Sequence, residues 1–335
     1  MIRTADAQLA LTHVFDSCAL FDRSDLGRLL GTGPDLLDLI HRLSTGDVRD
    51  LAHGKGRSTV LTTPKGRIVD LLFVHHLGEQ GVLLVGGPGC GSRVTTHLER
   101  YVFAEQIGLR DVTEETYQFA LIGPAAARAV RACGVEPPAA YDATTATIGG
   151  KTTHLLGQDG FESAGFSVSG PIGDGPDVQQ TLAEAVQGAG GSFAGKETLE
   201  SYRIFRGLPT AGHELTEEHN PLEAGLREAV SFDKGCYVGQ EVVARLRTYD
   251  KVSRSIVGLE LQKGSVVPPC GTALLLEGRT VGLLTSAVMP PGMERVVALG
   301  YVKRKALQAG LVLQVGENGP TARVVDLPFP RSRAD

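Results

Sequence analysis

The chain has 335 residues, of which 42% are hydrophobic and 21% charged, and its net charge is −5. This composition is typical of globular proteins and excludes a largely disordered chain, and the length predicts two or three domains. Because the balance is acidic, direct nucleic-acid binding through phosphates is not expected.

Five cysteines, an odd number, occur without regular spacing and without a Cys-x-x-Cys pair. This pattern argues against a secreted disulfide framework and against a self-contained metal site. The first residues contain no apolar signal segment, and no run approaches the ~18 apolar residues that a membrane helix needs. We therefore expect a cytoplasmic protein that makes no membrane contact and holds no metal.

In the first hundred residues, a strand-like start at Leu20 precedes a helix whose apolar residues, from Leu36 to Leu43, recur with helical spacing. Three strands follow, at 58–62, 67–75 and 82–85, separated by Gly- and Pro-containing turns. Ser92 is a candidate N-cap for a helix that reaches Phe103.

A second region of similar texture runs from 117 to 208. Its predicted strands are 117–122 and 166–169, and its predicted helices are 125–132 and 177–187. Further on, Asn220-Pro221-Leu222-Glu223 has the residues of a helix start, with Asn at the N-cap, Pro at N1 and Glu at N3.

The texture changes after Tyr249. Short β-branched segments spaced by Gly or Pro are typical of a small antiparallel barrel or sandwich, and they lie at 255–261, 273–276, 280–286, 296–302 and 311–315. The sequence therefore predicts an α+β body over residues 1–248 and a compact all-β domain over 249–330.

One stretch between these two parts is the most distinctive of the chain. It reads Lys234-Gly235-Cys236-Tyr237-Val238-Gly239-Gln240-Glu241. Two glycines let the backbone turn sharply around Cys236, and cations nearby in sequence (Lys234, Arg245 and Arg247) favour a thiolate. The alternative is an inert buried cysteine in a turn that leads into a helix.

This stretch resembles the signature of the YgfZ family, within the superfamily of the glycine-cleavage T-protein, and matches it at every specified position. A Pro-Leu-Glu-Ala-Gly-Leu segment at 221–226 precedes it, as in that family. The wider resemblance extends from about Phe15 to Val325. It implies a three-lobed ring of two α+β lobes and a C-terminal all-β barrel, with tetrahydrofolate or a derivative held near the centre.

The resemblance also implies folate contacts at three places. Asp70 matches an acidic residue after a Gly-rich turn, Glu162 ends a loop that binds the pterin, and Arg203 precedes another Gly-rich turn. A carboxylate such as Glu162 can accept two pterin N–H groups, Arg203 can pair with a carbonyl or the glutamate tail, and Asp70 can act as an acid or base. The alternatives are a surface carboxylate for Asp70, an ordinary loop residue for Glu162 and a salt-bridge partner for Arg203.

Three positions depart from the T-protein pattern. Leu71 replaces a second Asp, and Leu155 and Ala211 replace tyrosines. Together these losses weaken the case for aminomethyl transfer from a lipoyl carrier, and the loss of the two aromatic positions also reduces the stacking surface for a pterin.

Two other segments carry weaker signals. Residues 86–91 (Gly-Gly-Pro-Gly-Cys-Gly) lie between a predicted strand and a helix but match neither common phosphate-loop pattern. Residues 213–219 contain metal-ligand types at the wrong spacing for a His-Glu-x-x-His site, so a solvated acidic turn is the preferred interpretation.

The resemblance favours a folate-binding protein that supports assembly or repair of iron–sulfur proteins and has a link to tRNA modification. Its partners would be folate and either iron–sulfur proteins or their assembly machinery, with the Cys236 loop in redox or partner chemistry. The alternative is a folate-dependent one-carbon (aminomethyl) transferase or demethylase that uses Asp70. A scaffold without a ligand ranks third.

Overall fold

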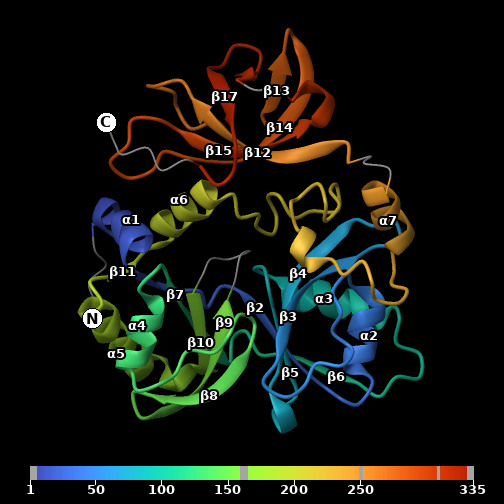
Figure 1. Ribbon diagram of the computed structural model, residues 1–335, viewed down its shortest axis with the longest axis vertical. Coiled ribbons are helices and arrows are strands. Elements are labelled where there is room, and N and C mark those ends of the chain that lie inside the picture. Colours follow the sequence, from blue (N-terminus) through green and yellow to red (C-terminus); the bar gives the residue numbers. More distant parts are fainter. Residues whose placement is uncertain (1–5, 159–164, 249–251, 308–309, 330–335) are drawn as a thin grey trace.

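The computed structural model describes residues 6–158, 165–248, 252–307 and 310–329. The chain forms two α+β lobes side by side and a β-barrel packed across both of them (Figure 1). The predicted three-lobed architecture, with a C-terminal all-β barrel, is confirmed. Within these residues, no helix is both long and apolar enough to cross a membrane.

The first lobe contains a five-stranded sheet with the order β3-β4-β5-β2-β6. These strands are β3 Gly56–Thr62, β4 Ile68–His76, β5 Val82–Gly86, β2 Gly27–Thr32 and β6 Gly108–Asp111. Helices α2 (Leu36–Leu43) and α3 (Cys90–Glu99) pack their apolar residues against it. Helix α3 begins at Cys90 rather than after Ser92, because Gly89 takes up a left-handed conformation and turns the chain into the helix two residues earlier.

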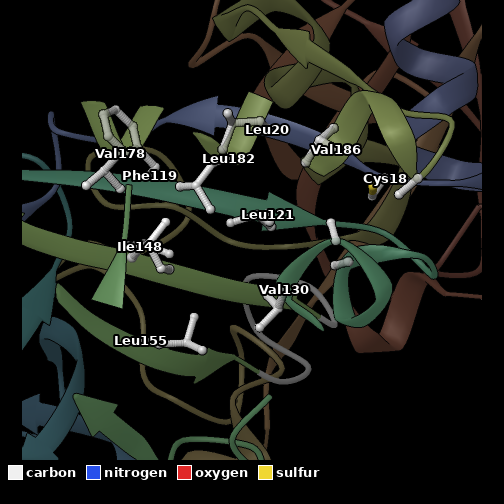
Figure 2. Packing of buried hydrophobic residues seen from close by; sticks show 14 of the residues in the cluster. Cys18, Leu20, Phe119, Leu121, Val130, Ile148, Leu155, Val178, Leu182 and Val186 are labelled. Carbon is white, nitrogen blue, oxygen red and sulfur yellow. The ribbon is translucent and has the colours of Figure 1, made fainter. Parts of the chain in front are cut away.

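The second lobe contains a six-stranded sheet with the order β11-β1-β7-β10-β9-β8. These strands are β11 Ser192–Ala194, β1 Ala19–Asp22, β7 Thr116–Ile122, β10 Gly165–Pro171, β9 Lys151–Gln158 and β8 Ala143–Ile148. Its helices are α1 Ala7–Asp16, α4 Ala126–Ala132, α5 Gly175–Gly188 and α6 Lys196–Arg206. Figure 2 shows Leu20 and Leu121 packed beneath Leu182 and Val186 of α5.

Strand β1 pairs with β7 and β11, so the N-terminal strand belongs to the second lobe although the first lobe follows it in sequence. The strand predicted at Leu20 is therefore present, but it lies in the second lobe, whereas the helix at 36–43 packs on the sheet of the first lobe. Such a pairing, between segments about a hundred residues apart, leaves no local pattern in the sequence.

The third lobe is a closed antiparallel barrel with the strand order β12-β15-β14-β13-β16-β17. These strands are β12 Arg254–Leu261, β15 Val297–Lys303, β14 Arg279–Val288, β13 Ala273–Leu276, β16 Val312–Val315 and β17 Thr321–Val325. The first five were predicted, and β17 was missed. Closure leaves no open sheet edge for another chain to pair with.

The helix predicted at Asn220 is wrong, although its capping interactions are present. The Asn220 side chain accepts from the amides of Leu222 and Glu223, and Glu223 accepts from the Asn220 amide at 3.3 Å. The backbone then leaves the helical path at Gly225, where φ is +76°. Only a turn forms, followed by a short 3-10 helix η3 (Arg227–Ala229), and the next α-helix is α7 (Gln240–Thr248).

The buried carboxylate of Glu214 joins the barrel to the second lobe. Its Oε2 accepts from Arg203 Nη1 on α6 at 3.2 Å and from the Thr210 amide at 3.1 Å. Its Oε1 accepts from the hydroxyls of Thr285 and Ser286 on β14, at 2.6 and 2.7 Å. A charge held without water needs such a set of donors, so α6, residues 207–226 and the barrel must assemble together.

The interpretation of 213–219 as a solvated turn is therefore wrong for three of its residues, Glu214, Leu215 and His219. Glu214 is fully buried, and His219 is 2% exposed with its ring stacked 3.6 Å from that of Tyr301. Glu217 and Glu218, between them, do face solvent.

Replacing Glu214 tests this joint. Glu214→Ala leaves Arg203 as a buried cation without its second carboxylate, and we expect it to lower the free energy of unfolding by about 3–5 kcal/mol. Urea and thermal unfolding measure the loss. The exposed neighbour Glu217→Ala serves as the matched control and should change stability by less than about 0.5 kcal/mol. Equal stability of the two variants would contradict this role for Glu214.

Candidate functional site

Asp70 lies near the start of β4 and is only 1% exposed, which excludes a surface carboxylate. Its Oδ2 accepts from Arg93 of α3, with Nε at 3.1 Å and Nη2 closer still. Its Oδ1 is buried and accepts no hydrogen bond from a described side chain. Burial raises the pKa of Asp70, and the Arg93 guanidinium together with the backbone amides of Gly87 and Leu71 opposes that rise. A buried acid with one unengaged oxygen is a candidate proton-transfer group.

Beside Asp70, the neighbouring Ala211 leaves no room for a side chain at Gly87. A Cβ there would lie 2.3 Å from Cβ of Ala211 and 3.7 Å from Oδ1 of Asp70. Residues 86–91 therefore form the wall of the Asp70 site, with Ala211 packed onto it. Ala211 directly follows Thr210, whose amide binds Glu214, so the 210–215 loop connects the Asp70 site to the buried joint.

Two of the three departures from the T-protein pattern lie in apolar cores. Leu71 is 6% exposed and belongs to a cluster between the lobes that also contains Leu156 and Leu215. Leu155 is fully buried in the second lobe among residues such as Leu20 and Phe119 (Figure 2). The expectation that Leu155 removes pterin-stacking surface is wrong, because its side chain points into the core beneath α5.

A second group of buried polar side chains crosses three strands of the second lobe. Gln118 on β7 and Gln158 on β9 both donate through Nε2 to the Ser167 hydroxyl on β10, at 3.4 and 2.7 Å. Oε1 of Gln118 is buried with no hydrogen-bond partner in the described part of the chain. Sequence analysis missed this group, although a glutamine within the otherwise apolar strand Thr116–Ile122 was a usable signal.

Glu162 lies outside the described residues, so its proposed pterin contact stays a prediction. Gln158 ends β9 and is the last described residue before that segment. The Gln118–Ser167 pair therefore lies near the end of β9 and the beginning of β10.

Arg203 is engaged at every guanidinium nitrogen. Nε donates to Glu200 at 2.6 Å, Nη1 donates to the Leu208 carbonyl and to Glu214 at 3.2 Å each, and Nη2 donates to Glu200 and to Ser286. This geometry matches the salt-bridge alternative and leaves no guanidinium nitrogen reserved for a ligand.

Lys234 anchors the motif at 234–241. Its ammonium is buried and donates to the carbonyls of His41, Ser44 and Gly46, at 2.6, 2.7 and 2.6 Å. Burial lowers the pKa of Lys234 to about 7. The ring of Tyr237 lies 5.0 Å from Nζ and covers it. These contacts tie the motif to the C-terminal end of α2.

The second half of the motif packs on the β3–β4 turn. The Val238 carbonyl accepts from Thr62 Oγ1 at 2.6 Å, and a Cβ on Gly239 (φ +84°) would lie 2.6 Å from the Thr63 carbonyl oxygen. Gln240 begins α7, and Glu241 pairs with Arg245. The loop is thus held at both ends.

Cys236 is exposed at the tip of this anchored loop, so the buried-cysteine alternative is wrong. The cations invoked from sequence are engaged elsewhere: Lys234 by carbonyls, Arg245 by Glu241, and Arg247 by Phe232, whose ring centroid lies 4.0 Å away. The charge argument for a thiolate therefore has no counterpart in the structure. Among the described residues, no three His, Cys, Asp or Glu side chains are grouped as metal ligands.

Comparison with known proteins agrees with this fold. The family profile of the GCVT N-terminal domain matches residues 6–234, and that of the glycine cleavage T-protein C-terminal barrel domain matches 254–330. The chain belongs to the GcvT family. The narrower YgfZ branch is not shown.

Two relatives and one solved structure are similar to this chain over most of its length. An aminomethyltransferase of Symbiobacterium thermophilum is 32% identical, covering 95% of this chain and 88% of the relative. A putative chloroplastic transferase of Arabidopsis thaliana is 30% identical, covering 92% and 71%. The structure of aminomethyltransferase T from Bartonella henselae superposes with a TM-score of 0.81 at 24% identity, covering 98% and 90%, which supports the GcvT fold.

Proposed function

We propose that this GcvT-family protein is a tetrahydrofolate-dependent aminomethyltransferase in which Asp70 is the acid–base group. The buried Asp70 carboxyl, with Oδ2 fixed by Arg93 and Oδ1 unengaged, carries the proposal. The similar relatives named aminomethyltransferase support it. This function was the alternative in the sequence analysis, and it now ranks above the iron–sulfur role.

In this proposal, buried polar atoms of both lobes bind a reduced pterin. A pterin presents several N–H donors, and a buried acceptor without a partner is costly unless a ligand supplies one. Asp70 Oδ1 and Gln118 Oε1 are two such acceptors, and Glu162 would be a third. When bound, tetrahydrofolate would supply the nitrogen that accepts the one-carbon group.

The protein residues would then perform distinct tasks. Arg93 holds Oδ2 of Asp70, so Oδ1 is the atom that can exchange a proton with an amine nitrogen. Burial brings the pKa of Asp70 closer to neutrality, which favours proton transfer in both directions. Gly87 and Ala211 form a wall that limits the space beside that carboxyl.

A second function is favoured by the Cys236 loop. A thiol exposed at the tip of a loop whose flanking residues are buried can reach a partner without rearrangement of the protein. In the second proposal, upkeep of iron–sulfur proteins, Cys236 would be the residue that contacts the partner.

Replacing Asp70 tests the first function. In single turnover with an aminomethyl donor and tetrahydrofolate, we expect Asp70→Asn to form methylene-tetrahydrofolate about 10²–10⁴-fold more slowly, because the amide cannot exchange the proton. Titration with tetrahydrofolate should show retained binding in Asp70→Asn, whereas Glu162→Ala should weaken it by about 1–3 kcal/mol. A full rate in Asp70→Asn, or no product from the native chain, would refute the proposal.

Replacing Arg93 should move the pH profile. Since the guanidinium opposes the raised pKa of Asp70, Arg93→Gln raises that pKa further. A rate that needs the carboxylate increases with pH through this pKa, so its rising limb should shift to higher pH. Arg93→Lys should restore most of the native profile, and the exposed Arg100→Gln should leave it unchanged. A shift to lower pH would contradict the assignment.

Cys236 and Lys234 can be separated in a strain that lacks the native protein. Cys236→Ser should leave thermal stability unchanged, because the side chain is exposed, but should abolish complementation if the thiol acts. Lys234→Met should lower stability as well, by about 1–3 kcal/mol for each carbonyl left without a donor. The exposed Lys65→Met is the control. Full complementation by Cys236→Ser would exclude the thiol role.

A further inference from the structure

A cavity of about 400 Å³ lies at the seam between the second lobe and the barrel, where α1 and α6 meet the barrel in Figure 1. Its walls come from four segments far apart in sequence: α1, the C-terminal end of α6, the β14–β15 connection, and the chain after β17. Its lining residues differ from those around Asp70 and Gln118. The size falls in the range of small-molecule sites.

Aromatic rings form much of the wall. Phe205 lies between Phe15 and Phe329, with ring centroids 5.9 and 5.7 Å apart and interplanar angles of 79° and 81°. The Phe329 amide donates to the Phe205 carbonyl at 2.8 Å, which fixes these two residues relative to each other. Walls of ring edges and faces held in this way suit a flat aromatic guest.

The charged residues of the lining favour an anion. Arg206 is exposed and forms no ion pair with any residue that the structure describes. Arg295, also in the lining, pairs with Glu260 at 3.1 Å, and Asp16 is the acidic residue of the lining. A planar guanidinium beside an apolar cavity can bind a carboxylate through two parallel hydrogen bonds.

We propose that this seam cavity binds a flat aromatic carboxylate of about the size of a bicyclic ring acid, with its ring among the phenylalanines and its carboxylate on Arg206. The site is independent of the function proposed above. Its occupant would contact α6 one turn from Arg203 and would hold that helix against the barrel. Because the occupant binds the folded chain and not the unfolded one, its binding stabilises the joint at Glu214.

The probe is 2-naphthoate, titrated calorimetrically into the full chain with saturating tetrahydrofolate present. We expect saturable binding of 2-naphthoate and a rise in the unfolding temperature. The neutral isostere 2-naphthalenemethanol should bind at least about tenfold more weakly than 2-naphthoate. Arg206→Gln should weaken naphthoate binding about ten- to hundredfold, because a charged hydrogen-bond partner is lost. Arg206→Lys should recover part of that loss.

Two further variants locate the site. Thr12→Trp, at an exposed position of α1 in the lining, should block the cavity and abolish binding. Arg131→Gln, an exposed arginine of α4 outside the lining, should leave binding unchanged. Any one of four results would overturn the proposal: no binding of 2-naphthoate, equal affinity for the alcohol, binding unchanged by both Arg206→Gln and Thr12→Trp, or displacement of 2-naphthoate by tetrahydrofolate.

Discussion

The buried ion pair between Arg203 and Glu214 determines how the barrel fits onto the second lobe. Its donors and acceptors come from α6, the 207–226 connection and β14, and each charge is satisfied only when all three segments are in place. Hydrophobic contacts along the same seam add stability but tolerate small displacements, whereas a buried charge does not. The pair therefore provides geometric precision at the point where the barrel meets the second lobe.

The 210–215 loop carries this geometric precision from Glu214 to the surroundings of Asp70. Thr210 binds Glu214, and Ala211 fills the space that a side chain on Gly87 would need, next to Asp70. The two buried carboxylates are satisfied differently. Glu214 uses both oxygens on protein donors, while Asp70 has Arg93 on one oxygen only. We take a fully satisfied acid as structural and a partly satisfied one as available to a ligand, which is why we propose Asp70 as the acid–base group.

Local pattern predicted much of the fold, and long-range contacts explain what it missed. Five of the six barrel strands and three of the five strands of the first sheet were predicted, because alternation and turn residues are local properties. Strands β2, β6 and β17 were missed. The pairing of β1 with β7, the burial of Glu214 and the engagement of Arg203 depend on segments distant in sequence. Asn220 shows the same limit: its cap formed as predicted, but Gly225 ended the turn before a helix developed.

The motif at 234–241 shows why a sequence signature does not by itself identify a reaction. Lys234, Tyr237 and Gly239 have hydrogen-bonding or packing reasons for their residue type, and the Val238 side chain packs against the core of the first lobe; these reasons hold whether or not Cys236 reacts. Most of the motif therefore describes how a loop is fastened to α2 and to the β3–β4 turn. Asp70 is different, because its carboxyl is buried with Arg93 as its side-chain partner on one oxygen, and a buried carboxyl oxygen without a side-chain donor is unfavourable in the free protein. That imbalance is the reason to rank folate-dependent transfer at Asp70 above chemistry at the Cys236 thiol.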